Sequence, residues 1–132
     1  MTNTIIMAVL TPESREHLLS ILPPVHGRVA AHHVTIAFKP PADMLEAYLP
    51  HHGRPVKVPL TCTEVWDDKA QAVEVKFAST NEHPHITVSL ADEVRAAYSN
   101  ELLARLNGHT EEMRPWLDGI QLDAVITIEA LL

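Results

Sequence analysis

The alternation of apolar and polar residues along the chain predicts a protein built mainly from β-strands. Short apolar or alternating runs, bounded by prolines or polar residues, recur about six times along the 132 residues. Two of these runs flank the polar turn Asp67-Asp68-Lys69, which predicts a β-hairpin, and Pro59 predicts an edge or a bulge in the first of them. The predicted strands, to within a few residues, span 4–10, 32–39, 56–63, 73–77, 83–90 and 121–129.

Helical spacing of apolar residues predicts two or three helices between these strands. Thr11-Pro12-Glu13 combines an N-cap residue, a proline suited to the first turn and an acid in that turn. Ser99 is expected to cap a later helix that ends before Gly108. Residues 109–119 are expected to form a polar connection with at most one helical turn. The predicted helices span 12–22, 44–49 and 100–106, and together with the strands they predict the α+β class.

Two of the predicted strands carry nearly the same tetrapeptide. The first contains His33-Val34-Thr35-Ile36, and the second contains His85-Ile86-Thr87-Val88. Side chains alternate between the two faces of a strand, so each histidine shares a face with the threonine two residues later. A single such tetrapeptide is common in strands, but two copies in the same apolar setting predict a symmetrical site.

Regular alternation would extend these two faces over the whole of each strand. The face expected to line the site comprises Ala31, His33, Thr35, Ala37 and Lys39 on the first strand, and His83, His85, Thr87 and Ser89 on the second. The face expected to enter the core comprises Val34, Ile36, Phe38, Ile86, Val88 and Leu90, and His32 is placed on the core side as well.

Two converging imidazoles can divide acid and base work, because histidine titrates near neutral pH. One neutral ring takes a proton from water while one protonated ring gives a proton to the leaving oxygen. The threonine hydroxyls can hold non-bridging phosphate oxygens and stabilise the charge that develops there. The pattern therefore predicts metal-free phosphodiester chemistry, with His33 and His85 as acid and base in either order, and Thr35 and Thr87 as phosphate ligands. A 2′,3′-cyclic phosphate suits it, since its leaving oxygen stays tethered.

Composition and charge restrict the substrate and the compartment. The formal net charge of −7 argues against a long duplex nucleic acid, which needs many phosphates neutralised. Residues 26–57 nevertheless carry four basic and two acidic residues, which fits a small or single-ended anion. Cys62 is alone, so no intramolecular disulfide can form. Without a signal-like or membrane-spanning apolar run, we expect a complete cytoplasmic protein, 1–132 as one domain, that binds no membrane and is a monomer.

The two motifs resemble the signature of the two-histidine (2H) phosphoesterases, in which H-x-[ST]-hydrophobic motifs lie on two strands several dozen residues apart. The second motif with Ser89, followed by Tyr98-Ser99-Asn100-Glu101-Leu102-Leu103, is similar to the cyclic phosphodiesterase domain of fungal-type tRNA ligases and related RNA-repair proteins. The resemblance implies a pseudo-twofold, two-lobed α+β fold with antiparallel-rich sheets around a central cleft and helices outside. It also implies metal-independent hydrolysis of RNA 2′,3′-cyclic phosphate ends or cyclic nucleotides, in many members to a 2′-phosphate. The small number of basic residues departs from what a long RNA would need.

Other interpretations of the same residues stay open. One is hydrolysis of a cyclic oligonucleotide or another small cyclic phosphate, and one of a different class is a non-catalytic module that binds nucleotides or RNA ends. Nine histidines also permit a metal site, but no His-Glu-x-x-His or Cys-x-x-Cys spacing occurs, so we expect no metal and no cofactor. Phe38 and Trp66 can either stack on a base or pack in the core.

Overall fold

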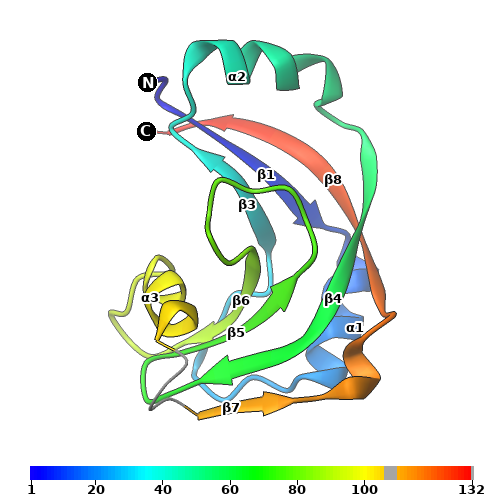
Figure 1. The fold of residues 1–132 in the computed structure, drawn as a ribbon, viewed down its shortest axis with the longest axis vertical. Helices are drawn as coiled ribbons and strands as arrows, with labels where there is room; N and C mark the ends of the chain where they lie inside the picture. Colours follow the sequence, from blue (N-terminus) through cyan, green and yellow to red (C-terminus); the bar gives the residue numbers. More distant parts are fainter. Residues whose placement is uncertain (106–109, 132) are drawn as a thin grey trace.

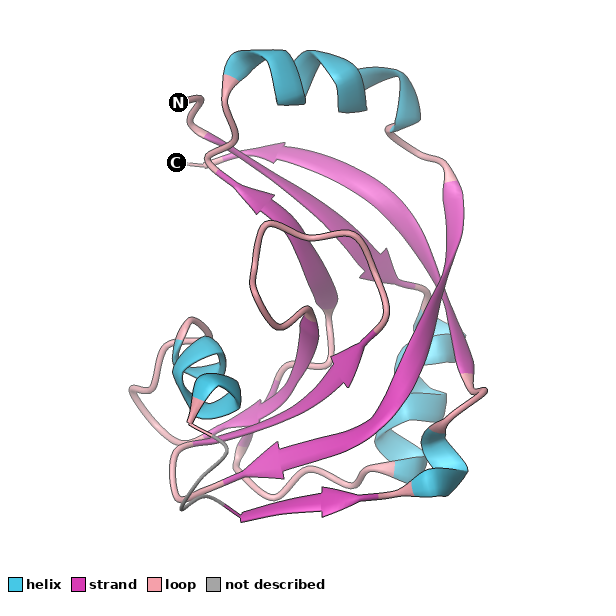
Figure 2. Ribbon diagram, viewed as in Figure 1, coloured by secondary structure: helices cyan, strands magenta, loops and turns pink. Residues whose placement is uncertain are grey.

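The computed structural model describes residues 1–105 and 110–131 as an antiparallel, sheet-rich α+β domain (Figures 1 and 2). The strands are β1 Thr4–Leu10, β2 Arg28–Val29, β3 His33–Phe38, β4 Pro55–Trp66, β5 Ala70–Val75, β6 His85–Leu90, β7 Thr110–Met113 and β8 Gln121–Ala130. The α-helices are α1 Pro12–Ile21, α2 Ala42–Tyr48 and α3 Tyr98–Ala104, and the short 3₁₀ turns are η1 Leu49–His51 and η2 Pro115–Leu117. The predicted class is therefore confirmed.

Six strands form a hydrogen-bonded path in the order β6-β3-β1-β8-β4-β5, and every pairing in it is antiparallel. Strand β5 also pairs with β6, so the path returns to the strand on which it began. The short strands β2 and β7 extend it by pairing with β6 and β4. Figure 1 shows the resulting strong curvature of the sheet. The β3–β6 pairing, with the single partner pair Val34 and Ile86, brings the two motif strands side by side.

The first helix begins where the local sequence predicted it. The Thr11 hydroxyl accepts a hydrogen bond from the Ser14 amide at 3.2 Å, and Pro12 occupies the first turn, where its missing N–H costs nothing. The helix buries Leu18 against the core. It is further tied to the sheet by the Asp123 amide, which donates to the Ser14 hydroxyl at 2.7 Å.

The β4–β5 hairpin is confirmed, although both strands are longer than the pattern predicted. The turn is held by the Asp67 carboxylate, which accepts hydrogen bonds from the amides of Lys69 and Ala70. Pro59 lies at the end of the pairing between β4 and β8, just before β4 begins to pair with β5. A proline is tolerated there because the strand changes partners.

Two predictions for the last third of the chain are wrong. Ser99 is not an N-cap: helix α3 begins at Tyr98, two residues earlier than predicted, Ala97 is in the cap position, and Ser99 is fully buried inside the helix. The stretch 109–119 was expected to lack a strand, but β7 pairs with β4 there, and the turn η2 follows. The predicted helix end at Leu106 and the following Gly108 lie outside the described residues.

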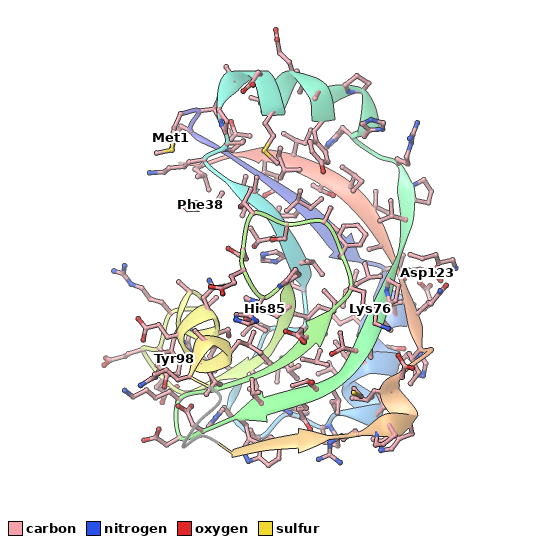
Figure 3. The ribbon with its side chains drawn as sticks, viewed as in Figure 1. Met1, Phe38, Lys76, His85, Tyr98 and Asp123 are labelled. Atoms are coloured by element: carbon pink, nitrogen blue, oxygen red, sulfur yellow. The ribbon has the colours of Figure 1, made fainter. Side chains whose placement is uncertain are left out.

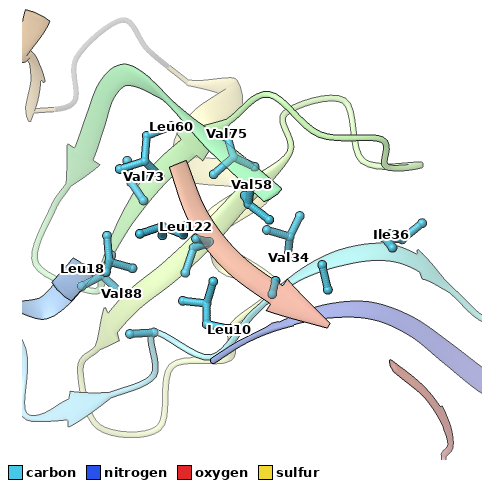
Figure 4. Close-up of a cluster of buried hydrophobic side chains, with 14 of the residues drawn as sticks. Leu10, Leu18, Val34, Ile36, Val58, Leu60, Val73, Val75, Val88 and Leu122 are labelled. Atoms are coloured by element: carbon cyan, nitrogen blue, oxygen red, sulfur yellow. The ribbon is translucent and has the colours of Figure 1, made fainter. Parts of the chain in front are cut away.

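Two groups of buried apolar side chains stabilise this arrangement. The larger one fills the interior between the strands and helix α1, and Figure 4 shows part of it, including Val34 and Ile36 of β3 and Val88 of β6. The smaller one joins Leu102 and Leu103 of α3 to the outer side of β4, β5 and β6. Helix α3 therefore rests on the sheet at the end of β6, beside the second motif (Figure 2).

Candidate functional site

The antiparallel pairing of β3 with β6 sets the two motifs against one another. With Val34 opposite Ile86, the register one residue to either side places His33 across from Thr87 and Thr35 across from His85. Directly opposite residues project on the same face with Cβ atoms about 5 Å apart. A local twofold axis through the central pair thus relates one motif to the other, histidine to histidine and threonine to threonine.

A β-bulge follows the motif in β3 and corrects the predicted faces. Strand β1 pairs Ile6 with Ala37 but Met7 with Thr35, so Ile36 is an extra residue on β3. The extra residue reverses the alternation beyond it. Ala37, predicted to line the site, is buried in the core, and Phe38, predicted to enter the core, is 53% exposed.

A second bulge occupies the same position in β6. Strand β5 pairs Gln71 with Ser89 but Ala72 with Thr87, so Val88 is the extra residue. The Ser89 side chain therefore turns away from Thr87, and its hydroxyl donates to the side-chain amide oxygen Oε1 of Gln71 at 2.6 Å. The prediction that Ser89 lines the site is wrong for this reason.

All four motif side chains line one pocket with a volume of about 290 Å³. The structure thus brings together the residues that the sequence singled out, His33, Thr35, His85 and Thr87. The remaining lining residues come from the ends of β1 and β3, the segment before β3, the loop between β5 and β6, and the start of α3: Ile5, Ala30, His32, Phe38, Asn81, Ala96, Ala97 and Asn100.

The His85 ring is held by a backbone carbonyl. Its Nδ1 lies 2.8 Å from the carbonyl oxygen of His83, which can only accept, so Nδ1 carries the proton and Nε2 of the neutral ring is the acceptor. The ring is nearly buried, with 9% of the residue exposed. Burial lowers the pKa of His85, while the hydrogen bond to the His83 carbonyl acts in the opposite direction. The neutral ring is therefore the resting form near pH 7.

His33 is surrounded by other imidazoles. Its Nδ1 lies 2.9 Å from Nδ1 of His32, and one of these two nitrogens donates to the other. The pKa of His33 is lowered to about 4, mainly by burial and to a smaller extent by the nearby charges of His32 and His85. In both motif histidines Nδ1 is engaged within the protein, which leaves Nε2 as the nitrogen available to a bound molecule.

His32 lies on the pocket side, contrary to the prediction that it faces the core. Between β2 and β3 the register against β6 changes, because Val29 pairs with Ser89 while Val34 pairs with Ile86. Ala31, in the left-handed backbone region at φ 48°, lies within this change and is buried in the core instead of lining the site. Strand alternation therefore does not apply to the residues just before His33.

Helix α3 supports the second motif through Ser99. The hydroxyls of Thr87 and Ser99 are 2.9 Å apart and share a hydrogen bond. The neighbouring Tyr98 hydroxyl donates to the Asp67 carboxylate, which anchors the start of the helix to the β4–β5 turn, and this hydrogen bond raises the pKa of Tyr98. Asn100 lines the pocket. Tyr98, Ser99 and Asn100 thus each have a separate place: one anchors the helix, one bonds to Thr87 and one lines the pocket. The sequence indicated only that this stretch resembles the family, and it gave no role to the single residues.

The loop between β5 and β6 places Asn81 at the pocket. The Ser79 hydroxyl donates to the Thr35 carbonyl at 2.7 Å and accepts from the Asn81 amide at 3.0 Å. A further bond, from the Thr80 amide to the Ile36 carbonyl, fixes the loop along β3. Asn81 was missed in the sequence because its position depends on these long-range bonds, and the only local signal is a run of small polar residues typical of a turn.

Three other residues that the sequence analysis considered for the site, His83, Lys39 and Trp66, do not line the pocket. The His83 ring contacts the Glu74 carboxylate at 3.3 Å, because β6 begins only at His85 and His83 precedes it. Lys39 places its ammonium group 5.5 Å from the centre of the Phe38 ring and does not line the pocket. Trp66 borders a separate cavity with Gln71. Within residues 1–105 and 110–131, no three His, Cys, Asp or Glu side chains are arranged to hold a metal ion.

The groups in the pocket suit acid–base chemistry on a phosphoester, because two imidazoles and two hydroxyls face one space. Comparison with known protein families gives independent evidence. The family model described as the fungal tRNA ligase phosphodiesterase domain matches residues 28–130, which include β2 to β8 and both motifs. The chain therefore belongs to this family, and the resemblance read from the two motifs is confirmed.

Membership of this family places the chain among the cyclic phosphodiesterases of RNA processing. A search of curated proteins found no match to the chain. Among the described residues, no helix is long and apolar enough to cross a membrane.

Proposed function

We propose that the protein is a metal-independent phosphodiesterase that hydrolyses the 2′,3′-cyclic phosphate of an RNA end or a nucleotide to a phosphomonoester. The observation that carries this proposal is the cross-strand arrangement of the motifs, His33 with Thr87 and Thr35 with His85, in one pocket. The family match supports the reaction type. The matched bulges after Thr35 and Thr87 support the two-lobed, pseudo-twofold fold of the two-histidine phosphoesterases, because corresponding positions deviate in the same way.

In the proposed reaction, water attacks phosphorus and the bond from phosphorus to O3′ breaks, which leaves a 2′-phosphate. His85 accepts the proton of the water at Nε2, since its Nδ1–H is already committed to the His83 carbonyl. His33 protonates the departing O3′ from its Nε2. The pKa of His33 is about 4 without substrate, and a phosphate anion beside the ring favours its protonated form.

The threonine hydroxyls hold the two non-bridging oxygens. No Lys or Arg is among the described residues that line the pocket, so neutral donors supply most of the stabilisation there. Asn81 and Asn100 add two amide groups at the rim. We further propose that the protein acts as a monomer in the cytoplasm, where the single Cys62 remains reduced.

The first test is turnover of a 2′,3′-cyclic nucleotide and of an oligonucleotide with a 2′,3′-cyclic phosphate end, with EDTA present throughout. We expect turnover that survives the chelator and falls by about 10²–10⁴-fold in His33→Ala and in His85→Ala, the range for loss of a general acid or base. His17→Ala, at an exposed position of α1, is the matched control and should keep full activity.

Each other outcome is informative. Absence of turnover with both substrates would refute the proposal, and tight binding of the product without turnover would favour a non-catalytic binding module. Turnover of a cyclic oligonucleotide or another cyclic phosphate in place of both would favour the related hydrolase. Dependence on added metal would contradict the proposed mechanism. Mapping the ribose position of the phosphate in the product tests the expected 2′-phosphate.

A further inference from the structure

Phe38 is an aromatic side chain that the bulge in β3 turns out of the core. The extra residue Ile36 reverses the alternation, so Ala37 takes the buried place and the Phe38 ring faces the pocket. With 53% of the residue exposed, the ring covers little of the core for its size. In Figure 3, Phe38 is labelled near the end of β3, above His85 in the view.

The corresponding residue in β6, Leu90, is buried where Phe38 is exposed. Leu90 lies two residues after the extra residue Val88, just as Phe38 lies two residues after the extra residue Ile36. The bulge in β6 therefore turns the Leu90 side chain to the other face of its strand, as the bulge in β3 does with Phe38. Leu90 is only 6% exposed, because Leu102 and Leu103 of helix α3 cover it. One half of the symmetrical site is therefore closed by a helix, and the other half leaves an aromatic ring open to the pocket.

The Phe38 ring lies within reach of a ligand whose phosphate is bound at the proposed position between the two motifs. Thr35 pairs with Met7 and Phe38 with Ile5, so the two residues lie two partner positions apart, which corresponds to about 7 Å along the strand. A ligand that places its phosphate between the motifs can therefore direct the rest of its structure towards the ring. An exposed aromatic face binds a flat, uncharged π-system by stacking, and every nucleobase offers one. The Lys39 ammonium lies over the Phe38 ring, 5.5 Å from its centre, and adds a positive charge next to this position.

We propose that Phe38 is a stacking platform for the base of the terminal nucleotide and makes the pocket selective for nucleotides over cyclic phosphates that lack a base. This inference rests on the proposed phosphodiesterase function and adds to it the residue that recognises the base of the substrate. Phe38 determines specificity and takes no part in proton transfer, so its effect falls on substrate binding.

The test compares two substrates that differ only in the base, adenosine 2′,3′-cyclic phosphate and methyl riboside 2,3-cyclic phosphate. We expect Phe38→Leu to raise KM for the adenosine substrate about tenfold, in the range known for the loss of base stacking, and to leave kcat within about twofold. KM for the riboside should not change. Phe38→Trp should retain or improve binding of the adenosine substrate, since it keeps an aromatic face.

Trp116→Leu is the matched control, because Trp116 is 51% exposed and does not line the pocket. Its kinetics with both substrates should equal those of the wild type. If Phe38→Leu changes KM for both substrates equally, or for neither, the stacking proposal is overturned while the phosphodiesterase function stands. If the wild-type protein turns over neither substrate, the proposed function fails and the stacking proposal fails with it.

Discussion

The environment of His33 links the chemistry of the pocket to the stability of the fold. Its ring is held beside two other imidazoles, and burial is the main reason why its pKa falls from 6.5 to about 4. In the unfolded chain the same ring is hydrated and titrates near its ordinary pKa of about 6.5. The folded protein therefore binds fewer protons than the unfolded chain between about pH 4 and pH 6.5.

This difference predicts a loss of stability on acidification. Well above pH 6.5 the His33 ring is neutral in both the folded and the unfolded state, so it does not change the free energy of unfolding there. As the pH falls towards 4, the unfolded chain gains a proton that the folded protein excludes, so the free energy of unfolding decreases. Between pH 7 and pH 5 the contribution of His33 to this decrease is about 2 kcal/mol. His33→Gln should therefore lose about 2 kcal/mol less than the wild type over this interval.

Urea denaturation at the two pH values measures this difference. His17→Gln, which changes an exposed histidine, serves as the control and should follow the wild type. The carboxylates titrate alike in all three proteins, so their contribution cancels in the comparison. The same pH dependence in His33→Gln as in the wild type would contradict the burial argument.

At the scale of the elements, helix α3 supports the second motif through the hydrogen bond between Ser99 and Thr87. The Ser99 hydroxyl, fully buried, holds the Thr87 hydroxyl at 2.9 Å, and Leu102 and Leu103 fix the helix against the sheet. This contact orients the Thr87 hydroxyl before any phosphate arrives, which reduces the cost of ordering it on binding.

Ser99→Ala should therefore weaken both stability and activity. Loss of the buried hydrogen bond is expected to lower the free energy of unfolding by about 1 kcal/mol. Activity, measured as kcat/KM on a 2′,3′-cyclic nucleotide, should fall by about three- to tenfold, which corresponds to about 1 kcal/mol of lost phosphate stabilisation. Ser20→Ala removes an exposed hydroxyl that bonds within α1 and should alter neither quantity. Lower stability with unchanged kcat/KM would mean that α3 has only a structural role.

At the scale of the whole molecule, the charge limits how much of an RNA can be bound. The chain carries a net charge of −7, and no cationic Lys or Arg side chain is among the described residues of the pocket. Strong binding along an RNA backbone needs several such contacts, each of which adds to the salt dependence. We therefore expect the protein to recognise the end of an RNA and little beyond it.

Chain length and salt concentration test this expectation. A decamer with a 2′,3′-cyclic phosphate end should have a KM within about threefold of that of a dinucleotide with the same end. Raising KCl from about 50 to 200 mM should increase KM by less than about threefold, because about one phosphate contact contributes to the salt dependence for single strands. A KM that falls steadily with RNA length, together with a steep salt dependence, would show an extended binding surface outside the pocket.

The predictable features of this protein are those that depend on neighbouring residues in the chain. Thr11 and Pro12 start a helix through contacts within one turn, and the prediction of α1 is confirmed for that reason. The two H-x-T motifs lie in apolar runs that form strands, so their faces could be derived within each motif. The hairpin around Asp67 is equally local.

The features that failed depend on partners distant in sequence. The bulges at Ile36 and Val88 exist because β1 and β5 pair with these strands in a shifted register, and no residue inside either strand predicts them. They reversed the expected sides of Ala37, Phe38 and Ser89. Ser99 was assigned as a cap because serine favours that position, but a packed helix with Thr87 as its partner outweighs this preference.

The sequence by itself determined which chemical groups the protein offers, since the repeated histidine and threonine need only strand periodicity to share a face. Only the tertiary structure decided how these groups meet, because the pairing of Val34 with Ile86 sets each histidine across from the threonine of the other motif. It also decided that Leu90 lies under α3 while Phe38 stays open to the pocket. The physical reason is that register, bulges and helix packing are set by contacts between distant segments, which a local pattern does not contain.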